Sequence, residues 1–267
     1  MITAITIAGV SGQMGRRLAA AASASPAFRI RGGTLRPGHP SLGQDIGLLA
    51  GTGPIGVAAS EDLEQALAGS QVLVDFTSPQ ALAGNLKAAA AQKTAAVIGT
   101  TGLGPAEMEL LREASASIAV LWAPNMSLGI NLLYKLADMA ARALGEDFDL
   151  EIVEAHHRRK KDAPSGTALK LAEVLAQARG LGPESRITGR QGLAGPRPAS
   201  EIGILAVRGG DIAGEHTIYF CGQGERLELT HRAQSRDTFA AGALRAAQWL
   251  AGRPCGQYSI NDVLGLN

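Results

Sequence analysis

The stretch ITAITIAGVSGQMGRRLAAAA, residues 2–22, decides the fold of this chain. Residues 2–8 form a short apolar run that predicts a strand, and the alanine-rich residues 16–22 predict a helix. Between them stand Gly9, Gly12 and Gly15, which permit a tight turn and the close approach of a pyrophosphate to the amides that open the helix. The GxxGxxG spacing is weak evidence alone. Its place directly after the first strand favours a nucleotide site over a packing accident.

Apolar strand candidates alternate with helical stretches through the first half of the chain, which predicts parallel βαβ units. The strands are expected at residues 28–35, 71–76, 95–98 and 118–122. Ligands of an open parallel sheet bind beyond the carboxyl ends of its strands. Each loop there is only a turn by itself, but together the loops predict a cofactor rim that contains Phe76, Thr77, Ser78, Gly99, Thr100, Thr101, Gly102, Ala123, Pro124, Asn125 and Met126.

The pattern changes after Leu128, where a helical segment at 129–144 leads into a region rich in strands. We expect strands at 149–155, 202–207, 217–221 and 227–231, and a mobile Gly, Pro and Arg-rich connection at 181–200. A helix at 238–251 is expected to pack back on the first domain. The fold class is therefore α/β, with a Rossmann-like parallel-sheet domain (1–127 and 236–267) and an α+β domain with a mixed sheet (128–235). Hinges are expected near Ser127 and Ser235.

The segment EAHHRRKKDAPSGTA, residues 154–168, has the composition of a reaction site. His156 stands where a strand ends, and histidine exchanges protons near neutral pH, with lysine as a second donor. Ser165, Gly166 and Thr167 are predicted to open a helix, whose amides and dipole suit a carboxylate or phosphate. The alternatives are a solvated basic patch or a contact with nucleic acid.

The choice between the two nicotinamide cofactors depends on the end of the second strand. An acidic residue there would bind the ribose of NAD, but this chain has Arg36, which suits the 2′-phosphate of NADP. We therefore expect NADPH in preference to NADH. The alternative is that Arg36 is an ordinary exposed loop residue.

Composition indicates a globular enzyme and excludes several other classes. A net charge of +1 argues against a dedicated nucleic-acid binder. Cys221 and Cys255 are too few for a disulfide framework or a zinc site, so we expect no metal and a reducing cytoplasm. No targeting segment or membrane span is expected, because the first apolar run passes straight into the glycine turn.

Several motifs together resemble the 4-hydroxy-tetrahydrodipicolinate reductase (dihydrodipicolinate reductase) family of the diaminopimelate route to lysine. They are GVSGQMGR, VDFTSP, VIGTTG, APNMSLGIN, EAHHRRKKDAPSGTA and RGGDIAGEHT, and the similarity covers nearly the whole length. The EAHHxxKxDxPSGTA signature is highly specific. The resemblance implies reduction of a small cyclic imine dicarboxylate by NADPH, with NADH possible, in a homotetramer formed by the second domain.

The resemblance also implies roles for individual residues. His156 would be proton donor and acceptor, Lys160 a proton donor and His157 a substrate-binding residue, while Gly166 and Thr167 would bind a carboxylate. The pyrophosphate loop would comprise Gly9, Val10, Ser11, Gly12, Gln13 and Met14. One departure is Arg36, because many members of the family have an acidic residue there.

Two other functions fit parts of the sequence. A related two-domain amino-acid or imine dehydrogenase would share the architecture but is not expected to share the PSGT segment. A noncatalytic NADPH-binding sensor would keep the glycine turn, yet it would not need His156, Lys160 and Thr167.

Overall fold

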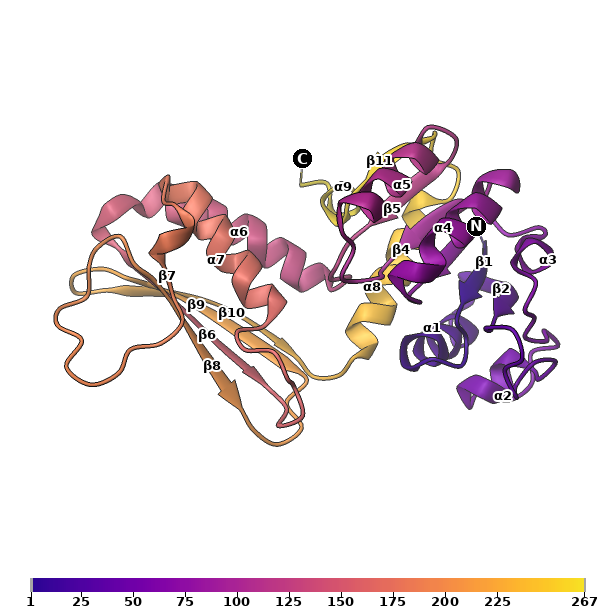
Figure 1. Ribbon diagram of the computed structural model, residues 1–267, viewed down its shortest axis with the longest axis horizontal. Coiled ribbons are helices and arrows are strands. Elements are labelled where there is room, and N and C mark those ends of the chain that lie inside the picture. The colour runs from indigo at the N-terminus through magenta and orange to yellow at the C-terminus, as the bar shows by residue number, and fades with distance from the viewer. Residues whose placement is uncertain (1, 267) are drawn as a thin grey trace. The chain divides into compact units, whose positions relative to one another are not determined.

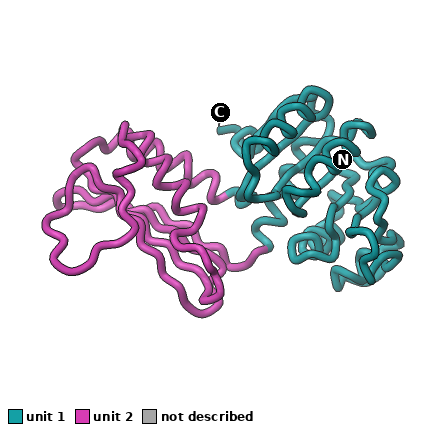
Figure 2. The backbone as a smooth tube through the Cα atoms, viewed as in Figure 1, with its two compact units in different colours: residues 1–128, 237–267 teal, residues 129–236 magenta. Residues whose placement is uncertain are grey.

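The computed structural model describes residues 2–266 and divides into two compact units (Figure 2). Unit 1 runs from the amino terminus to Leu128 and resumes at Asp237, and unit 2 is Gly129–Arg236. The domain boundaries predicted from the sequence, after residues 127 and 235, each lie one residue before those of the structure.

Unit 1 is built on a six-stranded parallel sheet in the order β11-β5-β4-β3-β1-β2. From β1 the chain goes to β2 on one side and then to β3 on the other, so the topological switch point lies beside β1. This arrangement confirms the predicted Rossmann-like domain, although β11 was not predicted. The strands are β1 (Thr3–Ala8), β2 (Phe28–Thr34), β3 (Val72–Asp75), β4 (Ala95–Ile98), β5 (Ala119–Trp122) and β11 (Gly256–Tyr258).

Helices cover both faces of this sheet, and each face has its own apolar core (Figure 1). Helices α1 (Gln13–Ser23) and α8 (Asp237–Leu250) pack on one face, and α4 (Pro79–Ala91) and α5 (Pro105–Ser115) on the other. The return of α8 to unit 1 agrees with the prediction. Three short helices were not predicted: α2 (Ile46–Ala50), α3 (Leu63–Leu67) and α9 (Ile260–Leu264).

Unit 2 contains a five-stranded mixed sheet in the order β10-β9-β6-β8-β7. Strand β6 (Asp149–His156) lies parallel to β8 (Ile202–Arg208) and antiparallel to β9 (Gly214–Cys221). The edges are β10 (Arg226–Ala233) and β7 (Arg186–Ile187). Helices α6 (Leu128–Leu144) and α7 (Gly166–Arg179) share the core of one face (Figure 1), which confirms the predicted mixed sheet. Among residues 2–266, no helix is long and apolar enough to cross a membrane.

The segment predicted as a mobile connection, residues 181–200, has structure of its own. It contains a 3₁₀ turn, Pro183–Ser185, and the edge strand β7. Arg190 and Arg197 both reach Glu151 of β6, and Arg197 also donates to the carbonyl of Leu150 at 3.0 Å. The glycine and proline content hid this anchoring, because the arginines bind partners that are remote in sequence.

Candidate functional site

A backbone hydrogen bond closes the glycine turn after β1. Gly9 has φ +71°, and its carbonyl accepts from the Gly12 amide at 3.0 Å. A β-carbon at Gly15 would lie 2.2 Å from the same carbonyl, so position 15 must lack a side chain. Helix α1 begins directly after Gly12, and no side chain caps it. The turn therefore leaves the start of the helix clear for an anion.

A cavity of about 430 Å³ gathers loops that follow three strands of unit 1. The buried Thr100 Oγ1 at this cavity has no hydrogen-bond partner among the described residues, so it offers a polar contact to a bound molecule. The cavity thus fits part of a cofactor bound beyond the carboxyl ends of the parallel strands. It is lined by Met14, Phe76, Thr77, Ser78, Pro79, Gly99, Thr100, Thr101, Pro124, Asn125, Met126 and Phe239.

Most of the predicted rim residues therefore meet at one place. Ala123 is buried just behind the lining, and Gly9 to Gln13 and Arg36 lie outside it. Thr77 and Ser78 line the cavity as predicted, Gly102 does not, and sequence reasoning missed Pro79 and Phe239. Phe239 comes from α8, which is remote in sequence from the other lining residues.

Close packing shapes the wall of this cavity. A β-carbon at Gly242 of α8 would lie 1.8 Å from the carbonyl oxygen of Met126, so the glycine lets the helix approach that loop. The buried carboxylate of Asp75 accepts from the Thr77 amide at 2.7 Å and from Asn85 at 2.8 Å, which orders the loop after β3. These contacts fix the backbone of the cavity before any ligand arrives.

The loop after β2 contacts the glycine turn through His39. Its Nε2 lies 3.2 Å from Ser11 Oγ, and its Nδ1 accepts from the Ser41 amide at 3.1 Å. Arg36 is exposed in the same loop, and Arg16 Nε donates to the Ser11 carbonyl at 2.9 Å. Arg16 and His39 thus contact the glycine turn, and neither contact was predicted.

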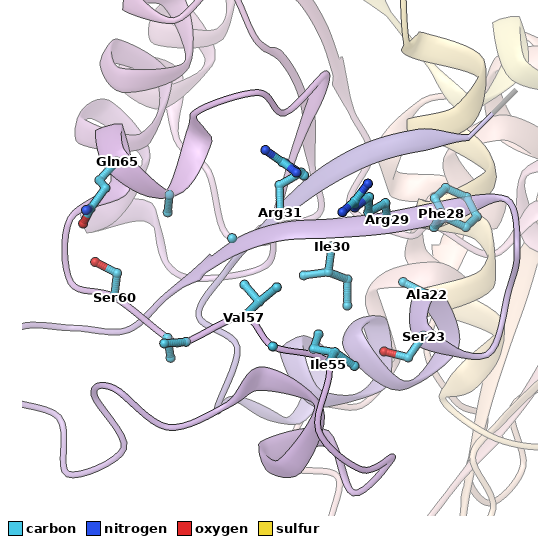
Figure 3. A pocket seen from close by; sticks show the side chains of 15 residues that line it. Ala22, Ser23, Phe28, Arg29, Ile30, Arg31, Ile55, Val57, Ser60 and Gln65 are labelled. Carbon is cyan, nitrogen blue, oxygen red and sulfur yellow. The ribbon is translucent and has the colours of Figure 1, made fainter.

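A larger cavity of about 830 Å³ lies elsewhere in unit 1, along the outer edge of β2 (Figure 3). Ile30, Ile55 and Val57 point toward one another there, while Arg29 and Arg31 project from the opposite side of the strand. None of the predicted site residues lines this cavity.

The reactive cluster of unit 2 lies on the buried side of β6. Leu150, Ile152, Glu154 and His156 alternate with more exposed neighbours, so all four face the helices. Glu154 is fully buried and His156 is 9% exposed. The inward-facing row of β6 therefore begins with apolar core residues and ends with a carboxylate and an imidazole.

Glu154 binds three elements of unit 2 at once. Its Oε2 lies 2.6 Å from His156 Nδ1 and accepts from Arg208 Nη1 at 2.8 Å. Its Oε1 accepts from Arg208 Nη2 at 2.7 Å and from the Ser165 amide at 2.9 Å. The end of β6, the end of β8 and the start of α7 are thereby joined through one carboxylate.

Ser165 caps α7, as its position in the sequence predicts. Its hydroxyl accepts from the Ala168 amide at 3.2 Å and lies 3.1 Å from His216 Nε2 of β9. Because Ser165 is buried with these partners, a side-chain contact with a substrate would require the bonds to open. Gly166 is exposed at the first turn, and Thr167 is half-buried and bonded to Tyr134. Burial raises the pKa of Tyr134 to about 12.

Lys160 and its neighbours lie in the loop between β6 and α7. Lys160 Nζ lies 2.8 Å from Asp162 Oδ2, and the lysine is mostly covered while Lys161 is exposed. His157 is half-buried, and its Nδ1 has no partner within residues 2–266. Burial and the contact with Asp162 thus distinguish Lys160 from Lys161.

Burial favours the neutral forms of His156 and His216. Burial lowers the pKa of His156, and Lys160 and Arg208 act in the same direction while Glu154 opposes them. Burial lowers the pKa of His216 to about 3. The two rings pack edge to face with centroids 5.2 Å apart. The cluster is therefore a buried proton-carrying site that holds little positive charge on its imidazoles.

Sequence reasoning missed Glu154, Arg208 and His216 as members of this cluster. Arg208 pairs with His156 in the parallel register, and His216 pairs with Glu154 in the antiparallel one. The alternation of residues along β6 was the available signal for Glu154. Every second residue from Leu150 points inward, and Glu154 follows Leu150 and Ile152 in that row.

Two family models match nearly the whole chain. The model of the dihydrodipicolinate reductase N-terminus matches residues 3–126, and that of the dihydrodipicolinate reductase C-terminus matches residues 129–264. A 4-hydroxy-tetrahydrodipicolinate reductase of Alkalilimnicola ehrlichii is 51% identical over 100% of both chains. One of Anaeromyxobacter dehalogenans is 48% identical over 99% of this chain and 98% of its own.

Solved structures share the fold at lower identity. The dipicolinate-bound dihydrodipicolinate reductase of Paenisporosarcina sp. TG-14 superposes with a TM-score of 0.76 at 23% identity, covering 97% of this chain and 98% of that one. An amine dehydrogenase of Mycobacterium smegmatis reaches a TM-score of 0.59 at 16% identity, with 97% and 95% covered. The two-domain architecture is therefore common to several reductases, and the fold alone does not select the substrate.

Proposed function

Since the chain belongs to the dihydrodipicolinate reductase family, we propose that it reduces 4-hydroxy-tetrahydrodipicolinate to tetrahydrodipicolinate with NAD(P)H. This is a step of the diaminopimelate route to lysine. The observation that carries the proposal is the meeting of His156, Lys160 and the start of α7 in unit 2, which joins proton carriers to a site for carboxylates.

The side chains of unit 2 would bind the substrate and supply its proton. Lys160 carries an ammonium group, and the imidazole of His156 stands at the neighbouring strand end, so a proton can be given to the ring as it gains electron density. Gly166 and Thr167 would bind a carboxylate at the helix start, and His157 would contact the same dianion. Ser165 would act mainly by capping the helix.

Unit 1 would bind the reduced nicotinamide, which supplies a hydride when present. Gly9, Val10, Ser11, Gly12, Gln13 and Met14 would bind the pyrophosphate at the start of α1, and the rim of the 430 Å³ cavity would bind the nicotinamide side. The exposed Arg36 beside the turn supports NADPH as the preferred cofactor, with NADH as the weaker one.

We also propose that the enzyme is a homotetramer assembled through unit 2. Helices cover one face of the mixed sheet, whereas Leu205, Val207 and Leu227 are exposed on its strands. Exposed apolar side chains on a sheet are suited to burial against another copy. We expect the enzyme to act in the cytoplasm, where Cys221 and Cys255 would stay reduced.

A coupled assay tests the reaction. The purified chain is mixed with the condensation product of pyruvate and aspartate semialdehyde, and oxidation of NADPH and NADH is followed separately. We expect turnover that requires this substrate, with the larger kcat/KM for NADPH. Binding of NADPH without substrate-dependent oxidation would instead identify a sensor.

A further inference from the structure

Glu154 occupies a position at which the alternating pattern of β6 predicts an apolar side chain. It continues the inward row of Leu150 and Ile152, and its side chain has no exposed surface. A carboxylate at such a place is costly unless it is paired and fully hydrogen-bonded. Its presence in the core of unit 2 therefore calls for a chemical reason.

The hydrogen bonds to the Glu154 carboxylate come from N–H donors. Arg208 binds both oxygens, at 2.8 and 2.7 Å, and the Ser165 amide donates to Oε1 at 2.9 Å. Burial alone would raise the pKa of Glu154, but the bonds from Arg208, His156 and Ser165 together keep it below its ordinary value. The carboxylate is thus ionised and can only accept the remaining bond, at 2.6 Å, from His156.

This bond determines which nitrogen of a neutral His156 carries the proton. Nδ1 must be the N–H that donates to Glu154, so Nε2 is left with a lone pair. A β-carbon at Gly214 would lie 3.1 Å from Nε2, and the absence of a side chain at that position leaves this nitrogen uncovered on that side. The charged and titratable groups around the ring are Glu154 on β6, Lys160 in the following loop, Arg208 on β8 and His216 on β9.

We propose that Glu154, bound by Arg208, is a positioning residue that fixes His156 as its Nδ1–H tautomer and presents Nε2 as the proton acceptor. The assignment rests on the proposed function for its kinetic consequence. An imidazolium formed at His156 is stabilised by the charge of Glu154, which stays ionised throughout. Because Nε2 holds no proton in the resting site, the Lys160 ammonium donates the proton to the ring and is left as an amine, which regains a proton from solvent, directly or through Nε2 of His156.

Nitrogen NMR of the whole chain tests the tautomer without any substrate. The protein is labelled with ¹⁵N-histidine, and the His156 signals are identified by their loss in His156→Gln. At pH 7.5 we expect a protonated Nδ1 and an unprotonated Nε2. A wild-type His156 that carries its proton on Nε2, or on both nitrogens, overturns the proposal.

The variant Glu154→Gln tests the consequence for turnover. An amide cannot accept all the bonds that the carboxylate accepts, so the Nδ1–H preference should be lost and kcat should fall by about 100-fold or more. KM should change less than about threefold, because Glu154 is too buried to touch a substrate. A folded variant with unchanged tautomer and kcat overturns the proposal.

Glu151→Gln is the matched control. Glu151 lies on the same strand and is also bound by two arginines, Arg190 and Arg197, but it has no histidine partner. We expect this variant to keep the His156 tautomer and kcat. Failure of the proposed function can be told apart from failure of this proposal. If the proposed function is wrong, the wild-type protein shows no imine reduction, but NMR of His156 still tests whether Glu154 fixes its tautomer.

Discussion

The candidate sites of the two units are shaped in different ways. Unit 1 shapes its cavity with missing side chains, since β-carbons at Gly15 or Gly242 would overlap backbone atoms. Unit 2 concentrates charged and polar side chains around Glu154, His156 and Arg208. Under the proposed function, backbone geometry would serve the binding of a large cofactor, while side-chain chemistry would serve the proton. Substitutions in unit 1 should therefore act on cofactor affinity, and those in unit 2 on turnover.

The largest effect should come from the proton carriers of unit 2. Lys160→Ala removes the ammonium group, so kcat should fall by about 10²–10⁴, the usual contribution of a general acid. The NADPH dissociation constant should stay within about twofold, which steady-state kinetics and cofactor titration would establish. His156→Gln should behave in the same way.

Lys161→Ala provides the comparison for this result. Lys161 is exposed beside Lys160, so its loss should change kcat by less than about threefold. If the two lysine variants lost activity equally, the assignment of Lys160 would be wrong. If Lys160→Ala mainly weakened NADPH binding, the division of labour between the units would fail.

In unit 1 the sharpest test is Gly15→Ala. The new methyl group would lie 2.2 Å from the Gly9 carbonyl oxygen and 2.8 Å from the Val10 α-carbon, so the turn must shift. Overpacking of this kind costs about 1–3 kcal/mol, which corresponds to a roughly 5- to 150-fold weaker NADPH affinity by calorimetry. Turnover at saturating NADPH should change much less.

Gly84→Ala in α4 is its control. A β-carbon there meets nothing within 4 Å, so NADPH affinity should be unchanged and the helix should gain about 0.5–1 kcal/mol. Equal losses of NADPH affinity in the two variants would show that the glycine turn has no special role.

A smaller effect concerns the stability of unit 2 at acid pH. Because the pKa of His216 falls from 6.5 to about 3 on folding, the unfolded chain binds a proton there that the folded chain excludes. The free energy of unfolding should therefore decrease as pH falls below 6.5, by about 2 kcal/mol at pH 5 from this residue. Burial lowers the pKa of His156 and His231 in the same sense.

Amide exchange in β6 and β9 would measure this loss. His216→Gln keeps a donor near Ser165 but does not titrate, so exchange protection should depend less on pH between 6.5 and 5 in the variant. The same pH dependence in variant and parent would contradict the prediction.

The smallest expected effect is on cofactor choice. Arg36→Ala should weaken NADPH by about 10-fold through the loss of one charge-assisted contact, and NADH by less than about twofold. Titration of both cofactors at low and high salt would measure the difference. Equal weakening of both would remove Arg36 from the 2′-phosphate site.

Local patterns were sufficient to predict the parallel sheet, the mixed sheet and the start of α7. The strand, glycine turn and helix at residues 2–22 are contiguous, so propensity and spacing carry the information. The predicted rim residues likewise meet because carboxyl ends of parallel strands share one edge.

Strand register was the part that local patterns could not supply. Arg208 and His216 are remote from Glu154 in sequence, and only the pairing of β6 with β8 and β9 brings them to it. Strand β11 is only three residues long, so it leaves no strong local signal. Phe239 reaches the 430 Å³ cavity from a helix that is distant in sequence, so local patterns do not reveal it either. Arginines in the glycine-rich segment 181–200 likewise bind partners that composition does not reveal.

Trp122 gives unit 1 an optical property of its own. Its indole Nε1 donates to the Thr100 carbonyl at 3.1 Å, directly behind the cavity rim, and Trp249, the other tryptophan of the chain, also lies in unit 1. Indole emission overlaps the absorption of a dihydronicotinamide. Tryptophan fluorescence should therefore quench as the reduced cofactor enters, giving a binding signal from unit 1 in the absence of substrate.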